Sequence, residues 1–394
     1  MPITMKKQTI AINTPYPHPD AYGALSMPVY NCCAYEFESA ATMTDAFTGK
    51  VLEPDYSRTM NPTVSHFEDR VKALTGATNV AAFNSGMAAI SNVLVASLAA
   101  GKNIVTSRHL FGNTFALITT TLARFGVEAR LADLTAPRAV EAVVDNNTAC
   151  IFCEIITNPQ MEVADLSALA AIAHKKHIPL IADTTMIPFS QFSAKSLGVD
   201  IEVVASTKYI SGGATSLGGL VIGYGSFPEI EKKVKWELLF NLGAYMTPHA
   251  AYMQTLGLET LDVRYARQAD NALNLAQRLI SIPGVAKVNY PALPSSPFFD
   301  LAQRQFGSTG GAMITLDLDS EQDCYLFLNR LNLVHRATNL FDNRTLAIHP
   351  FSTIFGAFSP EQKAIMDVLP TTIRISVGLE DPDDLLNDIK QALP

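Results

Sequence analysis

The sequence predicts an α/β protein with a large domain built on a mostly parallel, doubly wound sheet and a smaller C-terminal α+β domain. Between residues 63 and 225, short apolar runs alternate with segments of helical periodicity, the pattern of parallel strands joined by crossover helices. Beyond residue 250 a long helical stretch and a proline-rich loop replace this alternation, which indicates a change of domain. At 394 residues the chain also exceeds the usual length of a single-core domain.

The individual elements follow from these runs. Strands of the large domain are predicted at residues 80–83, 103–107, 127–133, 149–156, 178–183, 201–206 and 217–223. Helical periodicity between them predicts helices at 64–74, 87–98, 114–125 and 166–177. In the C-terminal part we expect a helical stretch at 250–282 interrupted near Gly257, strands at 312–318 and 372–377, and helices at 321–331, 360–366 and 382–392.

Residues 1–55 form no evident unit of their own. Positions 22–37 are rich in apolar and aromatic residues without a partner nearby in the sequence. We therefore predict an N-terminal arm that wraps the large domain or, as we favour, contacts a neighbouring subunit. Residues 56–250 would then form the large domain and residues 251–394 the small one.

Charge and composition exclude several classes of function. The formal net charge of −8 leaves no basic surface of the kind that nucleic acids require. The first residues carry two lysines but no continuous apolar stretch, so no cleaved secretion signal is expected. The most apolar run, residues 86–100, contains Ser91, Asn92 and Ser97 and is shorter than a membrane-spanning helix. We expect a cytoplasmic protein whose partners are small molecules, with no nucleic acid and no membrane.

The cysteines indicate a reducing compartment rather than a disulfide framework. The chain has five, at positions 32, 33, 150, 153 and 324, an odd and sparse set. Cys150 and Cys153 are spaced like a redox or zinc pair, but on a strand this odd spacing sends the side chains to opposite faces. We predict buried structural thiols at these two positions, packing roles for Cys32 and Cys33, and no metal site.

Polar residues at strand ends are the first candidates for a binding site, because ligands bind at the carboxyl ends of parallel strands. Asp183 ends one predicted strand and Lys208 follows the next. Taken singly, the aspartate could be a turn residue and the lysine could be solvated. Residues 84–88, Asn-Ser-Gly-Met-Ala, stand where a strand gives way to a helix and could hold a phosphate. A lysine, a carboxylate and an anion cradle are together what a pyridoxal phosphate site requires.

Nearly the whole chain resembles the Cys/Met-metabolism group of fold-type-I pyridoxal phosphate (PLP) enzymes. This group includes cystathionine synthases and lyases, methionine γ-lyase and O-acetylhomoserine sulfhydrylase. The motifs that carry the resemblance are YSRTMNPT at residue 56, NSGMAAI at 84, LFGNT at 110, TNP at 157, ADTT at 182, STKYISGG at 206, LGLETL at 256 and IRISVGLED at 373.

The resemblance implies specific roles. Lys208 would bind the cofactor covalently and carry protons, Asp183 would pair with the ring nitrogen, and Arg374 would bind the substrate α-carboxylate. Tyr56 and Arg58 would reach the phosphate in a neighbouring subunit's site, in a homotetramer built from dimers that share active sites. Further implied contacts are Gly86, Met87 and Thr207 for the phosphate, Ser85, Phe111 and Asn158 for the rest of the cofactor, and Asn339 for the substrate.

Departures from the family pattern bear on the reaction. Phe111 stands where the family usually has a tyrosine; phenylalanine can stack on the cofactor ring but cannot titrate. Proton transfers would then depend on Lys208, with Tyr56 as the candidate for any further acid. Ala205 replaces a usual phosphate-binding serine, for which Ser206 could substitute. Arg344 replaces a usual glutamate and either accepts an anionic sulfur donor or succinyl group or is a surface residue.

These features favour an acylated homoserine as the substrate, because acetate or succinate needs less protonation on leaving than a thiolate or amine. Asn113 stands where similar methionine γ-lyases carry cysteine, and residues 213–219 resemble the sulfhydrylases. The short segment after the lysine loop instead resembles a synthase or lyase. We expect γ-replacement by a sulfur nucleophile, giving homocysteine or a thioether. A C–S lyase is the alternative, and a catalytically inactive PLP-binding scaffold is a remote third.

Overall fold

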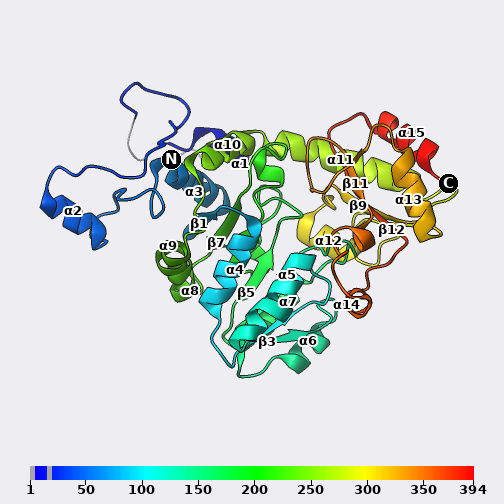
Figure 1. Ribbon diagram of the computed structural model, residues 1–394, viewed down its shortest axis with the longest axis horizontal. Helices are drawn as coiled ribbons and strands as arrows, with labels where there is room; N and C mark the ends of the chain where they lie inside the picture. Colours follow the sequence, from blue (N-terminus) through cyan, green and yellow to red (C-terminus); the bar gives the residue numbers. More distant parts are fainter. Residues whose placement is uncertain (1–4, 16–19) are drawn as a thin grey trace.

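Two sheets organise the chain in the computed structural model, which describes residues 5–15 and 20–394 (Figure 1). The predictions for the N-terminal arm and for a leader segment also cover residues 1–4 and 16–19, which lie outside the described residues.

The larger sheet has seven strands in the order β1-β7-β6-β5-β4-β2-β3. Its strands are β1 Asn79–Phe83, β2 Asn103–Thr106, β3 Glu128–Leu131, β4 Thr148–Glu154, β5 Leu180–Asp183, β6 Ile201–Val204 and β7 Gly219–Gly223. The sheet is parallel except at β7, which runs antiparallel to both neighbours. A parallel connection needs a crossover element, and residues 205–218 contain only a short 3₁₀ turn, Tyr209–Ser211. The mostly parallel sheet is confirmed, with β7 as the exception.

Both faces of this sheet are covered, as the prediction of a doubly wound sheet requires. Successive residues of β5 alternate between two hydrophobic clusters, because Ile181 packs in one and Leu180 and Ala182 pack in the other. Cys150 and Cys153 are buried and divide between the same two clusters, which confirms their predicted placement on opposite faces. The helices of this part are α3 Pro62–Thr75, α4 Gly86–Ser97, α5 Gly112–Ala116, α6 Pro137–Val143, α7 Leu166–Lys175, α8 Pro228–Lys233, α9 Leu239–Leu242 and α10 Pro248–Glu259.

The segment predicted as one helix at 114–125 changes its helical type along its length. After α5 it continues as a π-helical turn, Leu117–Thr121, and a 3₁₀ turn, Leu122–Phe125. The Thr119 hydroxyl donates to the Phe115 carbonyl at 2.8 Å and so competes with the backbone for its helical acceptor.

Gly257 does not interrupt a helix, contrary to the prediction. Helix α10 runs through it, and a Cβ at this position would lie 2.0 Å from the carbonyl oxygen of Ile210. The glycine therefore permits close approach of α10 to the loop that carries Lys208. The break lies instead at Thr260, between α10 and α11 Leu261–Leu279.

The smaller sheet has five strands in the order β10-β11-β12-β9-β8. The predicted strands β9 and β12 are present, whereas β8, β10 and β11 are too short to show a periodicity in the sequence. The elements are β8 Lys287–Asn289, β9 Met313–Asp317, β10 His335–Arg336, β11 Leu346–Ile348, β12 Thr372–Ser376, α12 Phe299–Phe306, α13 Glu321–Arg330, α14 Pro360–Ile365 and α15 Pro382–Ala392. The segment around α14 crosses to the larger sheet, since Phe355, Met366 and Val368 pack in the same cluster as Phe83 and Phe152.

The N-terminal region divides into two parts. Helix α1 Lys7–Asn13 rests on the body, with Lys7 Nζ donating to the Phe189 carbonyl at 2.6 Å. The segment with α2 Ala40–Phe47 extends away from the body (Figure 1). In the chain that precedes it, Tyr22 and Leu25 are each 97% exposed. Cys32 and Cys33 are also exposed, so their predicted packing role is wrong within this chain. Along the described residues, we find no helix with the length and apolarity to span a bilayer.

Candidate active site

A cavity of about 300 Å³ lies at the carboxyl ends of β4, β5 and β6. A wider groove of about 870 Å³ shares Thr207, Lys208 and Asn339 with it and leads outward. Every predicted site residue except Tyr56 and Arg58 lines the cavity, namely Ser85, Gly86, Met87, Phe111, Asn158, Asp183, Thr207, Lys208, Asn339 and Arg374.

Lys208 lies in the loop after β6, and its Nζ donates to Asn339 Oδ1 at 2.6 Å. Burial is the main reason that the pKa of Lys208 falls from 10.5 to about 8; the charge of Arg374 lowers it further, and that of Asp183 opposes both. A substantial share of this amine is therefore neutral near physiological pH, the form that attacks a carbonyl carbon and accepts a proton.

Two carboxyl groups stand side by side where β4 and β5 end, because Glu154 and Asp183 are paired in the sheet register. Asp183 Oδ1 accepts from the backbone N–H of Thr185 at 3.0 Å, and burial raises its pKa. Glu154 Oε1 accepts from the backbone N–H of Phe111 at 2.6 Å. Burial, and then the charge of Asp183, raise the pKa of Glu154 well above its ordinary value. When two buried carboxyl groups are adjacent, one pKa is strongly raised, so Glu154 is the more readily protonated of the two and Asp183 is the one available to face a cation.

The N-terminus of α4 opens onto the cavity. Ser85 caps this helix, with its hydroxyl accepting from the Ala88 N–H at 3.1 Å. The first-turn N–H groups of Gly86 and Met87 have no acceptor within the helix, which suits them to an anion. A Cβ on Gly86 would lie 2.6 Å from the Ala205 Cβ, so glycine is needed where the helix starts beside β6.

The hydroxyl groups near this cradle are less available than predicted. The Thr207 hydroxyl donates to the Gly218 carbonyl at 3.1 Å and accepts from the Gly218 N–H at 2.9 Å, so the chain itself already uses its proton. Ser206 is fully buried and lies against Gly218, outside the cavity lining. The expectation that Ser206 takes the place of a serine at position 205 is therefore wrong.

Arg374 is a buried cation on β12. Its guanidinium donates to Asn158 Oδ1 at 3.3 Å and to the Asn339 carbonyl at 3.1 Å. Its Nε has no hydrogen-bond partner among the described residues, and burial lowers the pKa to about 9. A buried guanidinium bonded to neutral oxygens is suited to receive a carboxylate from a ligand.

Tyr56, Arg58 and Arg344 lie away from the cavity. Tyr56 is 45% exposed, and the Arg58 guanidinium lies 5.5 Å from the centre of its ring. Arg344 lines the outer groove, where its side chain is 66% exposed and pairs with Asp342 at 3.3 Å. The roles of these three residues stay predictions.

Known proteins resemble this chain over almost its full length. The family described as "Cys/Met metabolism PLP-dependent enzyme" matches residues 8–394. An O-succinylhomoserine sulfhydrylase from Pseudomonas aeruginosa is 36% identical, covering 93% of this chain and 90% of that protein. An L-methionine gamma-lyase from Pseudomonas putida is 35% identical, covering 98% and 96%. A crystal structure described as an O-acetylhomoserine (thiol)-lyase of Campylobacter jejuni, with a pyridoxyl-lysine monophosphate, has a TM-score of 0.95 at 31% identity, covering 98% and 99%.

Proposed function

Because the chain belongs to the family of Cys/Met metabolism PLP-dependent enzymes, we propose that it catalyses γ-replacement on an O-acylated homoserine. A sulfur nucleophile takes the place of the acyl group, and the product is homocysteine or a thioether. The observation that carries the choice of substrate is Phe111 in the cavity wall. It offers no titratable group beside Lys208, so the leaving group must depart without a phenol at position 111 to protonate it. A carboxylate such as acetate or succinate meets that condition.

The cofactor is pyridoxal 5′-phosphate, and the cavity residues fit it. Lys208 would hold the aldehyde carbon, Asp183 the ring nitrogen, and the N-terminus of α4 the phosphate. The unpaired Nε of Arg374 leaves a donor for the substrate carboxylate. When bound, the cofactor supplies an electron sink next to Cα of the amino acid.

The protein's own groups then bind the substrate and move protons. Arg374 holds the α-carboxylate, which places Cα near Lys208. Lys208 would carry one proton at a time: it would remove the proton from Cα, hand it to the conjugated system of the bound cofactor and, neutral again, remove one from Cβ, while Asn339 orients its amine. The bond between Cγ and the acyl oxygen breaks, and the acyl group leaves as a carboxylate with the electron pair. A thiol adds to Cγ through sulfur. The protons taken from Cα and Cβ are returned to those carbons, and the thiol proton balances the charge of the departed carboxylate.

The test is a substrate panel on the purified holoenzyme. O-acetylhomoserine and O-succinylhomoserine with sulfide are expected to give homocysteine, measured as a new thiol. Methionine or cystathionine alone should release little 2-oxo acid. The C–S lyase alternative would be supported, and γ-replacement contradicted, by oxo-acid release from these thioethers at a rate above that of homocysteine formation.

Arg374→Lys should raise KM for the acylated homoserine by about 10- to 100-fold, because lysine cannot donate from two nitrogens to one carboxylate. The change in kcat should be much smaller, since the lost contact exists before and during the reaction. Arg278→Lys is the matched control, because Arg278 forms an exposed ion pair with Asp383 at 2.6 Å. Steady-state kinetics measure both. A fall in kcat with KM unchanged would contradict the assignment.

The oligomer that we propose is a homotetramer of dimers that share active sites, in the cytoplasm. The exposed side chains of Tyr22 and Leu25 support an interface, and the five free cysteines support a reducing compartment. Arg58→Ala and Lys208→Ala subunits should each be inactive alone, but a refolded equal mixture should recover about a quarter of the wild-type activity. Half of the dimers are then mixed, and each has one intact site. If Arg58 serves its own chain's site, the mixture stays inactive.

A further inference from the structure

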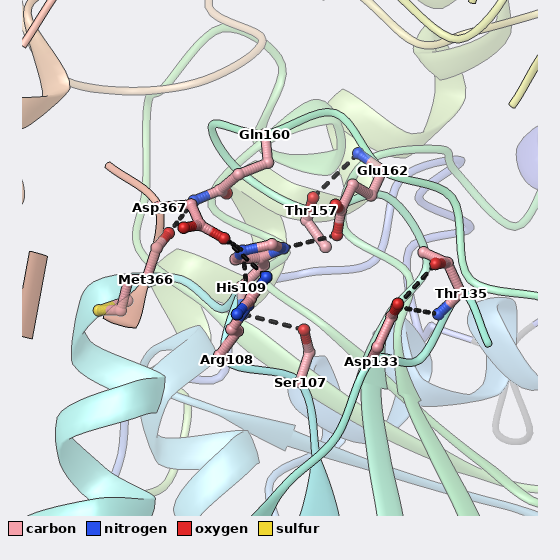
Figure 2. Close-up of polar contacts among 10 residues, drawn as sticks. All are labelled: Ser107, Arg108, His109, Asp133, Thr135, Thr157, Gln160, Glu162, Met366 and Asp367. Carbon is pink, nitrogen blue, oxygen red and sulfur yellow. Dashed lines mark hydrogen bonds and ion pairs between the residues drawn. The ribbon is translucent and has the colours of Figure 1, made fainter. Parts of the chain in front are cut away.

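A buried histidine outside the cavity lining joins three segments of the chain. His109 lies in the turn between β2 and α5, and its side chain is only 7% exposed. Figure 2 shows its ring between two carboxylates: Nδ1 lies 2.6 Å from Glu162 Oε2, and Nε2 lies 2.9 Å from Asp367 Oδ2. Arg108 completes the group, with a terminal nitrogen 2.8 Å from Asp367 Oδ2 and its Nε 3.2 Å from His109 Nε2.

The two carboxylates favour the doubly protonated ring, because only an imidazolium can donate from both nitrogens. In that state the group holds two cations and two anions. Burial alone would lower the pKa of His109, but Glu162 and Asp367 outweigh both burial and the charge of Arg108, and the pKa lies above its ordinary value. In the neutral ring, Nε2 would accept from Arg108 and turn a lone pair toward Asp367. The proton on Nε2 therefore decides whether His109 holds Asp367.

The segments joined by His109 either contain residues that line the cavity or contact such a segment. His109 itself precedes Phe111, whose N–H donates to Glu154. Glu162 lies on the loop that also carries Asn158, the acceptor for Arg374. Asp367 follows α14. Gln160, on the loop of Glu162, donates from Nε2 to the carbonyl of Met366 at 2.6 Å and so forms a second contact between the same two segments (Figure 2).

We propose that His109 is a positioning residue: its doubly protonated ring clamps Glu162 and Asp367 and thereby fixes Phe111 and Asn158 on two sides of the cavity. The inference rests on the proposed function, since these two residues are assigned there to the cofactor ring and to the partner of the substrate-binding arginine. Loss of the Nε2 proton removes the hydrogen bond from His109 to Asp367, so that only Arg108 of this pair still holds the carboxylate, while Nδ1–H still binds Glu162. Asn158 then holds Arg374 less firmly, and substrate binding weakens as the pH rises.

The kinetic test compares His109→Gln with wild type. Glutamine can donate to one carboxylate and accept from Arg108, but it cannot take up a proton. KM for the acylated homoserine should rise by about tenfold at neutral pH, with kcat within about twofold. The ratio of the variant's KM to the wild-type KM should fall toward one as the pH rises, because titrations common to both proteins cancel in this ratio. His174→Gln is the matched control, because His174 pairs with Asp200 at 2.9 Å near the start of β5, at the opposite end of that strand from Asp183.

Two measurements without substrate separate this inference from the proposed reaction. In the apoenzyme, the thermal stability that His109 provides over glutamine should be fully present below about pH 6.5 and be lost as the pH rises through the raised pKa. In the holoenzyme, the induced circular dichroism of the cofactor band should change in His109→Gln and Asp367→Asn but not in His174→Gln. These signals would support the clamp even if homocysteine were not formed. The inference would be overturned if His109→Gln and Asp367→Asn both had the same spectrum, the same stability profile and the same KM profile as wild type.

Discussion

Lys208→Ala is expected to lower kcat by about 10⁴-fold or more, because one amine supplies both the covalent attachment and the proton transfers. Among the described residues that line the cavity, Lys208 is the one lysine. Phe111 cannot replace it, since its ring carries no titratable proton. The cofactor should still bind noncovalently, because the helix N-terminus and Asp183 remain. Absorbance of the dialysed protein measures cofactor retention, and single-turnover assays measure the rate.

Two controls make this result specific. Lys235→Ala removes a lysine that bonds to Glu68 at 2.6 Å outside the cavity, and it should leave the rate of turnover nearly unchanged. In wild-type apoenzyme, the rate of covalent reloading with cofactor should rise with pH and level off above about 8, since burial lowers the pKa of Lys208 from 10.5 to that value. If the rate of reloading continued to rise toward pH 10, the pKa of the Lys208 amine would not be lowered. Substantial turnover by Lys208→Ala would reject its catalytic role.

The sequence could predict Asp183 and Lys208 because their position depends on a local rule: parallel strands present their carboxyl ends at one edge of the sheet. The same rule could have identified Glu154. The apolar run at 149–156 was instead assigned to a strand that continues past Glu154, whereas β4 ends at that residue. The predicted end of this strand is two residues too late, and for that reason Glu154 is not recognised as a buried acid at a strand end.

Other features depend on contacts between distant segments, which periodicity does not report. Lys208 bonds to Asn339 across 131 positions of the chain, and only the family resemblance pointed to Asn339. Glycine is typical of a helix break, but Gly257 instead lets α10 pack closely against the backbone of Ile210. The role of His109 could not be predicted from the sequence, because its partners, Glu162 and Asp367, come together only in the fold.

Amide substitution should affect kcat very differently at the two neighbouring acids, Asp183 and Glu154. Asp183→Asn removes the carboxylate that we propose to face the ring nitrogen, and kcat is expected to fall by about 10²- to 10³-fold. Glu154→Gln keeps an oxygen that accepts from the Phe111 N–H and resembles the protonated acid, so kcat should stay within about threefold. Steady-state assays at saturating cofactor measure both. Equal losses in the two variants would contradict the assignment of charge to Asp183.

The apoenzyme of Asp183→Asn should be more stable than that of wild type, even though the variant loses activity. Burial raises the pKa of Asp183, so in the fold its ionised form is disfavoured. This cost grows as the pH rises above the ordinary value of 3.8, and it is complete once the pH exceeds the raised pKa. Asp183→Asn removes that cost and also the charge that raises the pKa of Glu154. Asp183→Asn is therefore expected to have a more stable apoenzyme than wild type at neutral pH, with the difference vanishing in acid. Thermal unfolding against pH measures this, and it would identify Asp183 as a group held in an unfavourable state until a cationic ring nitrogen balances it.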